Sequence, residues 1–105
     1  MNPYMVRVSA KAWDQAAEAS DWYAANVGLD VAEAFEDRFE EGVLSLASMP
    51  LRHPVVRGLG ARHVYVPGFP FAIWYEVSEG ERSVSVLGLS HGHMGELTLD
   101  RRITR

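Results

Sequence analysis

Two kinds of side chain that can carry acid–base or phosphate chemistry stand at the ends of the stretch from Ala61 to Met94. Arg62 lies at its start, and His91 and His93 lie near its end. An imidazole titrates at about pH 6.5 and can move a proton, and a guanidinium stabilises the negative charge of a phosphate. Arg62, His91 and His93 are therefore candidate catalytic residues of an acid–base site.

Each candidate also has an ordinary structural explanation. His91 and His93 are two residues apart, so on a strand both would point to the same side. Two imidazoles without a nearby carboxylate or thiolate seldom bind a metal ion, so we expect no metal and no cofactor. A histidine bonded to the backbone beside an exposed histidine is the simpler explanation. Arg62 is either a functional cation or the cross-strand partner of Glu76.

Three strand-like runs would position these residues. They lie at 64–66, 71–77 and 84–89 and are rich in aliphatic, β-branched and aromatic residues. The connectors between them are too short for a crossover helix, so we expect neighbouring strands to be antiparallel. Trp74 and Tyr75 then point to opposite faces of the sheet. If Tyr75 faces the core, Trp74 is exposed on the open face, where a partner can bury it.

A short strand at 4–9 and an amphipathic helix are predicted before these runs. The helix begins near Ser9 or Ala10, and Gly28 is predicted to end it in a left-handed conformation. Its apolar face, at helical spacing, is predicted to contain Trp13, Ala16, Ala17, Ser20, Tyr23, Ala24 and Val27. Trp13 and Trp22 are expected to pack within the helical hairpin described next.

A second helix follows after two or three residues. Asp30, with Glu33 three residues later, resembles a capping box and is predicted to open this helix, and Pro50 is predicted to end it. Its apolar stripe is predicted to contain Val31, Phe35, Phe39, Gly42, Val43, Leu46 and Met49.

Two helices joined so closely must run antiparallel as a hairpin, and their apolar faces need a sheet to cover. The sequence therefore predicts an α+β fold with the order β-α-α-β-β-β, in which a helical hairpin packs on one face of a small antiparallel sheet. We expect a single domain over residues 1–105, with 95–105 as a short tail whose structure the pattern does not define.

Composition excludes several classes of function. The chain has no cysteine, which excludes a disulfide framework, a thiolate zinc site and a cysteine nucleophile. No apolar run is long enough to span a bilayer and no secretory leader is evident, so we expect a cytoplasmic protein without membrane contact. Residues 10–49 carry nine acids against two basic residues, whereas residues 50–105 carry seven Arg against five acids. The net charge of −4 argues against a general nucleic-acid binder.

The order and spacing of these features resemble the toxins of the ParE/RelE superfamily over roughly residues 5 to 94. The motifs that carry the resemblance are the helix end Leu46-Ala47-Ser48-Met49-Pro50, the strand-opening Arg62, the strand motif Ile73-Trp74-Tyr75, the final run Val86-Leu87-Gly88-Leu89-Ser90-His91, the aromatic pair Trp22-Tyr23, and Phe35 with Phe39.

The resemblance implies the RelE/ParE-like fold and the toxin of a type II toxin–antitoxin module, neutralised by a cognate antitoxin. RelE-like members cut mRNA on the ribosome, and ParE-like members inhibit DNA gyrase. RelE-like toxins draw on Lys and Arg of the sheet, but the only lysine here is Lys11, no tyrosine follows Tyr75, and Gly92-His93-Met94 stands where ribonucleases carry an Arg. The sequence thus favours the ParE-like branch, which has no established catalytic residues.

This interpretation leaves two alternatives open, a RelE-like ribosome-dependent mRNA endonuclease and a non-toxic α+β interaction domain. The expected partners are the antitoxin and, for the ParE-like branch, DNA gyrase, without direct sequence-specific binding of nucleic acid by the toxin alone. Arg57, Arg62 and Trp74 are the candidate partner-binding residues, because the Arg-rich second half favours an acidic antitoxin segment.

Overall fold

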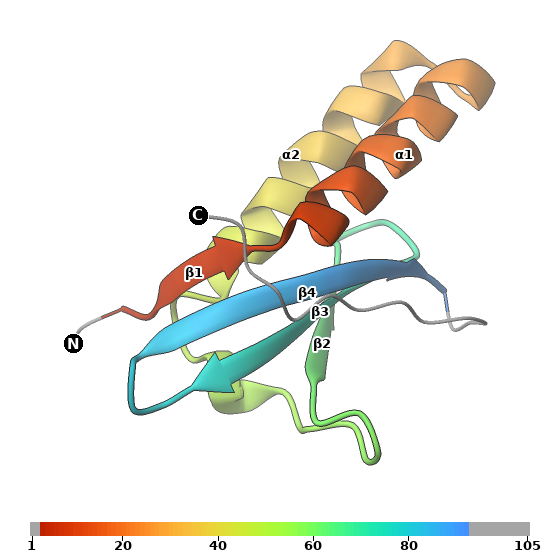
Figure 1. Ribbon diagram of the computed structural model, residues 1–105. Coiled ribbons are helices and arrows are strands. Elements are labelled where there is room, and N and C mark those ends of the chain that lie inside the picture. Colours follow the sequence, from red (N-terminus) through yellow and green to blue (C-terminus); the bar gives the residue numbers. More distant parts are fainter. Residues whose placement is uncertain (1–2, 93–105) are drawn as a thin grey trace.

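A computed structural model describes residues 3–92 of the chain. It contains a helical hairpin, one 3₁₀ turn and a four-stranded sheet (Figure 1). The elements in chain order are β1 (Met5–Val8), α1 (Ala10–Asn26), α2 (Leu29–Ser45), the 3₁₀ turn η1 (Pro50–Arg52), β2 (Arg62–Tyr65), β3 (Phe71–Ser78) and β4 (Ser83–His91). This order confirms the predicted β-α-α-β-β-β arrangement.

The sheet is mixed, with the strand order β1-β4-β3-β2. β2 and β4 both pair with β3 in antiparallel fashion, as the short connectors predict, but β1 runs parallel to β4. The prediction of a purely antiparallel sheet was therefore wrong at β1. The whole helical hairpin and two strands separate β1 from β4 in the chain, and a connection of that length permits parallel pairing.

Ser9 fixes the start of α1 against the sheet. Its buried Oγ accepts the Ala12 N–H at 3.1 Å, as expected for an N-cap, and donates to the Leu87 carbonyl at 3.1 Å. The register of β4 shifts at Trp74 and Tyr75, so that Leu87 is an extra residue in the β3–β4 ladder. One hydroxyl thus joins the helix start to an irregular point of the central strand.

The buried face of α1 differs from the predicted face. Small residues are buried along it, namely Ala12, Ala16, Ala19 and Ser20. Trp13 is 55% exposed and Trp22 is 58% exposed, although the Trp13 ring meets the Phe39 ring edge-on at 5.9 Å. α1 packs against both α2 and β4, and small side chains allow that close approach where a tryptophan would not fit.

The turn between the helices also differs from the prediction. Gly28 has φ and ψ of 157°, not the left-handed helical values, and it precedes α2 as its N-cap. The N–H groups of Val27 and Gly28 both donate to the Tyr23 carbonyl and end α1. Asp30 lies in the first turn of α2 and does not open it. A Cβ on Gly28 would lie 2.7 Å from Asp30 Oδ1, which explains the glycine.

α2 ends at Ser45, earlier than the proline signal predicts. Leu46 N–H bonds the Val43 carbonyl in a tighter 3₁₀ pattern, and Met49 takes a left-handed conformation with φ of 53°. Pro50 then begins η1 and does not itself end the helix.

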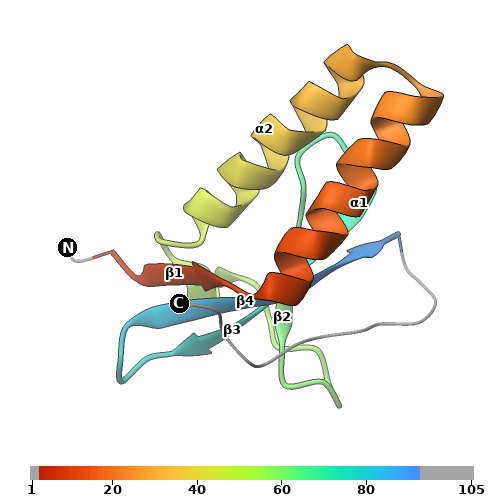
Figure 2. The same cartoon turned by 45° about the horizontal axis from the view of Figure 1, so that its top comes forward.

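The hairpin covers one face of the sheet, and the turn between its helices extends beyond the sheet (Figures 1 and 2). Phe35, Phe39, Val43 and Leu46 are buried with Ile73 and Tyr75 of β3, which confirms the predicted contact between α2 and the sheet. Gly42 brings α2 close to β3, since a Cβ there would lie 2.8 Å from Ile73 Cδ1. Across residues 3–92, no helix is long and apolar enough to cross a membrane.

Candidate functional site

Arg62 opens β2, where its register partner is Tyr75. Its Nη1 donates to the Leu51 carbonyl at 3.3 Å and also to the His53 carbonyl. The guanidinium therefore holds the loop after α2 against the sheet. The register disfavours the alternative pairing with Glu76, because Glu76 follows Tyr75 and points to the opposite face.

Tyr75 faces the core and reaches the same loop. Its Oη donates to the Pro50 carbonyl at 2.7 Å, and the side chain is completely buried. Burial raises the pKa of Tyr75, with Arg62 and Arg52 opposing that change. The phenol thus remains a neutral hydrogen-bond donor at neutral pH and serves to position the loop.

His53 stands beside this contact. Burial lowers its pKa, and the charges of Arg52, His63 and Arg62 lower it further. Its Nε2 is buried and has no hydrogen-bond partner among residues 3–92. A neutral imidazole is therefore favoured here. Sequence analysis did not single out His53, because the path of a loop is not encoded in periodicity.

Trp74 lies on the face of the sheet opposite the helices, as predicted from an inward Tyr75. It is half-buried, its Nε1 donates to Ser90 Oγ at 2.9 Å, and its ring lies 4.7 Å from that of His63. Tyr65, 50% exposed, lies 5.5 Å from the same His63 ring. The open face thus carries a small aromatic patch of His63, Tyr65 and Trp74.

His91 lies at one end of β4, away from Arg62. It pairs with Phe71, and the two rings lie 4.9 Å apart, whereas Arg62 pairs with Tyr75. Four residues of strand separate the two positions along β3, or about 13 Å. The structure therefore does not bring Arg62 and His91 together. His93 lies outside the described residues, and Arg57 is exposed in the loop before β2.

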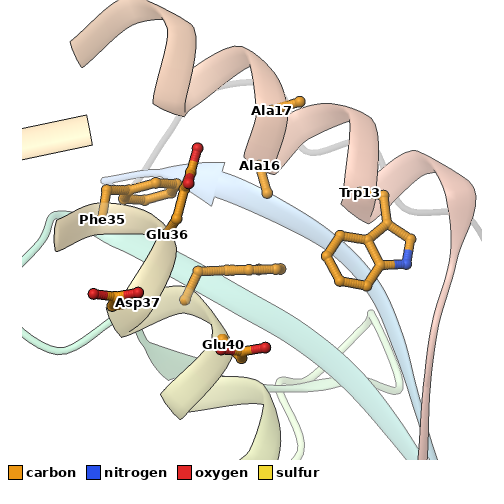
Figure 3. A pocket seen from close by; sticks show the side chains of 8 residues that line it. Trp13, Ala16, Ala17, Phe35, Glu36, Asp37 and Glu40 are labelled. Atoms are coloured by element: carbon orange, nitrogen blue, oxygen red, sulfur yellow. The ribbon is translucent and has the colours of Figure 1, made fainter. Parts of the chain in front are cut away.

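A groove of about 380 Å³ runs between the two helices (Figure 3). Trp13, Ala16 and Ala17 of α1 line one side, and Phe35 and Phe39 contribute an apolar floor. An acidic rim is formed by Glu36, Asp37 and Glu40 of α2. We call this rim together with the apolar floor the hairpin groove.

Sequence analysis counted these acids but did not single them out as part of a site. Their spacing at i, i+1 and i+4 beside an aromatic stripe was visible in the sequence, but the sequence did not show which of them would lie beside Trp13. Glu36 also accepts a hydrogen bond from Ser20 Oγ across the hairpin, so part of the rim is held in place. The groove thus combines an apolar floor with an acidic rim.

Known proteins resemble this chain in sequence and in fold. A family described as the ParE toxin of type II toxin–antitoxin system, parDE, matches residues 6–95. No curated protein matches the chain.

Three solved structures share the fold. The chromosomal ParDE toxin–antitoxin system from P. aeruginosa matches with a TM-score of 0.75 and 16% identity, covering 86% of this chain and 97% of that one. The toxin–antitoxin complex RelBE2 from Mycobacterium tuberculosis matches at 0.60 and 22% identity, covering 87% and 93%. The isolated E. coli RelE toxin matches at 0.52 and 16% identity, covering 89% and 88%.

Proposed function

Because the chain belongs to the ParE toxin family of type II toxin–antitoxin systems, we propose that it inhibits DNA gyrase and is neutralised by a cognate antitoxin. The family match, which extends over residues 6–95, supports the antitoxin partner. Inhibition of gyrase is favoured over cleavage of mRNA by the separation of Arg62 from His91 along β3.

A ribonuclease needs a cation directed at the scissile phosphate and a proton-transferring group within reach of it. The guanidinium of Arg62 instead donates to two loop carbonyls. His91 stands at the far end of β3 beside Phe71. This separation is the single observation that favours a non-catalytic poison.

Two assays on the purified protein test the proposal. Supercoiling of relaxed plasmid by gyrase should be inhibited in proportion to toxin concentration, and mRNA in a translating extract should remain intact. His91→Ala should inhibit gyrase as strongly as the unchanged protein. Codon-periodic cleavage of mRNA, lost in His91→Ala, would instead favour a RelE-like endonuclease, and inactivity in both assays with no growth arrest on expression would favour a non-toxic interaction domain.

The hairpin groove is the surface that best suits the antitoxin. Its floor is apolar and its rim is acidic, so an amphipathic antitoxin helix with basic residues beside its apolar stripe would complement it. Trp13 supplies an exposed aromatic ring of the kind that dominates binding energy at interfaces.

The earlier candidates for partner binding fit less well. Arg62 is engaged with the loop carbonyls, and Trp74 is partly covered by its contacts with His63 and Ser90. Arg57 is exposed and remains a prediction as a contact for an acidic partner segment.

A further inference from the structure

A pocket at the end of the molecule away from the helix turn has the opposite charge to the hairpin groove. It has a volume of about 570 Å³ and lies where the chain enters β1, leaves α2 and turns from β3 to β4. Arg52 and Arg82 flank it, and Tyr4, Met49, Pro50 and Leu51 give it apolar walls. None of the described residues that line it is acidic.

Both apolar and basic groups are presented to solvent here. Met49 is 70% exposed, and Leu51 and both arginines are also exposed. The Arg82 guanidinium lies 4.4 Å above the centre of the Tyr4 ring, which places a cation at the wall of an apolar hollow. Arg52 and Arg82 are thus the charged side chains among the described residues that line this apolar hollow.

Two rim residues hold uncommon backbone conformations. Met49 has φ of 53° and Arg82 has φ of 50°. Both lie in the left-handed region, which residues other than glycine seldom adopt. The Met49 side chain is mostly exposed, so its backbone conformation does not serve to bury it in the core. Such strain persists only where the surrounding structure imposes it, and it often marks a functional site.

The walls of the pocket are fixed by hydrogen bonds. Tyr4 N–H donates to the Ala47 carbonyl at 2.8 Å, and Met5 N–H donates to the Arg82 carbonyl at 2.9 Å. The Tyr75 phenol donates to the Pro50 carbonyl, and the Arg62 guanidinium donates to the Leu51 carbonyl. A pocket built from groups already tied to the sheet loses little entropy when a ligand enters.

We infer that this pocket binds an acidic segment of a partner protein, in which a bulky apolar side chain is flanked by aspartate or glutamate. The apolar side chain would enter the hollow between Met49, Leu51 and Tyr4, and the carboxylates would pair with Arg52 and Arg82. Arginine forms bidentate, charge-assisted hydrogen bonds with carboxylates. The apolar walls favour a peptide over a nucleic acid, whose backbone would meet two arginines among the described residues that line the pocket. The inference concerns this pocket alone and holds whichever target the toxin has.

A selection from a random peptide library on the immobilised protein tests the ligand class first. Enriched sequences should combine an apolar residue with flanking acids, and a fluorescently labelled peptide of that kind should bind in solution. Replacing its acids by the neutral amides Gln and Asn should weaken binding by about tenfold or more.

Variants of the protein then locate the site. Each of the variants Arg52→Gln and Arg82→Gln should bind the labelled peptide about tenfold more weakly. Arg38→Gln removes the same charge from an exposed position of α2 that does not line the pocket, and it should change affinity by less than about twofold. Met49→Gly should weaken binding while leaving the melting temperature unchanged or higher, because glycine tolerates the left-handed conformation. A merely structural role of Met49 would not separate those two measurements.

Several results would overturn the inference. The selection could enrich no acidic peptides, or Arg38→Gln could weaken binding as much as Arg52→Gln, which would indicate non-specific attraction. A labelled single-stranded oligonucleotide that binds through Arg52 and Arg82, when acidic peptides do not, would assign the pocket to nucleic acid.

Discussion

The phenol of Tyr75 donates a hydrogen bond of 2.7 Å to the carbonyl of Pro50. This bond joins the middle of β3 to the 3₁₀ turn that follows α2, across 25 residues of chain. Arg62 secures the next part of the same loop through the carbonyls of Leu51 and His53. Two side chains of the sheet therefore define the position of a loop that has little regular structure of its own.

Removing the phenol hydroxyl should destabilise the fold. Tyr75→Phe leaves the Pro50 carbonyl without its buried donor, and we expect the free energy of unfolding to fall by about 1–3 kcal/mol. Tyr65→Phe is the matched control, because Tyr65 is half-exposed on the open face, and it should change stability by less than about 0.5 kcal/mol. Urea denaturation followed by circular dichroism measures both. Equal losses in the two variants would contradict the assigned role of the hydroxyl.

The close approach of α2 to β3 should appear as non-additivity between two substitutions. Gly42→Ala places a methyl group 2.8 Å from Ile73 Cδ1, so the gain in helix propensity is offset by overpacking. Ile73→Val removes that Cδ1 atom. The double variant should therefore be more stable than the sum of the single effects by about 1 kcal/mol, as measured by denaturation of all four proteins. Additive effects would show that the two residues do not meet.

His53 should make stability depend on pH in a defined direction. Its pKa is lowered in the folded protein, first by burial and then by the charges of Arg52, His63 and Arg62. Above the ordinary pKa of about 6.5, both states are neutral and the full stability is present. As the pH falls below that value, the unfolded chain binds the proton first, so the free energy of unfolding should decrease.

His53→Gln should reduce this loss of stability between neutral and mildly acidic pH. NMR titration of the His53 ring measures the pKa directly, and Arg52→Gln should raise that pKa by removing one of the charges that lower it. A His53 resonance that titrates at or above its ordinary value would contradict the prediction.

Charge reversal at the hairpin groove should weaken binding of the antitoxin. Glu40→Lys places a cation on the acidic rim, and we expect slower association and a dissociation constant raised by about tenfold. Glu33→Lys is the matched control, since Glu33 is an exposed acid of α2 that does not line the groove. Surface plasmon resonance at two salt concentrations measures both. If Glu33→Lys is as damaging as Glu40→Lys, the acidic charge of α2 acts only at long range.

The element order and the core of α2 could be predicted because their signals are local. Phe35, Phe39, Val43 and Leu46 repeat at helical spacing, and all four are buried. The inward direction of Tyr75 was one of two choices that strand alternation allows. The buried face of α1 could not be predicted in the same way, since hydrophobicity favours Trp13 over Ala12, whereas packing between two helices and a sheet favours the smaller residue.

The candidate site was less predictable because it depends on contacts between distant segments. Arg62 was correctly singled out, but its partners are carbonyls of a loop whose path no periodicity specifies. The hairpin groove depends on which acids of α2 lie beside Trp13, and that follows from the crossing of two helices. Residue spacing within one element does not contain this information.

The parallel pairing of β1 with β4 also determines when the protein can finish folding. Ser9 and Leu87, which close this pairing, are 78 residues apart in the chain. A ribosome that adds about 5–20 residues each second needs roughly 4–16 s to make that stretch. β4 lies between β1 and β3 in the sheet, so the first strand to be synthesised must wait for the last one before it has a neighbour. During this interval a nascent toxin lacks its central strand, and its sheet cannot yet be complete.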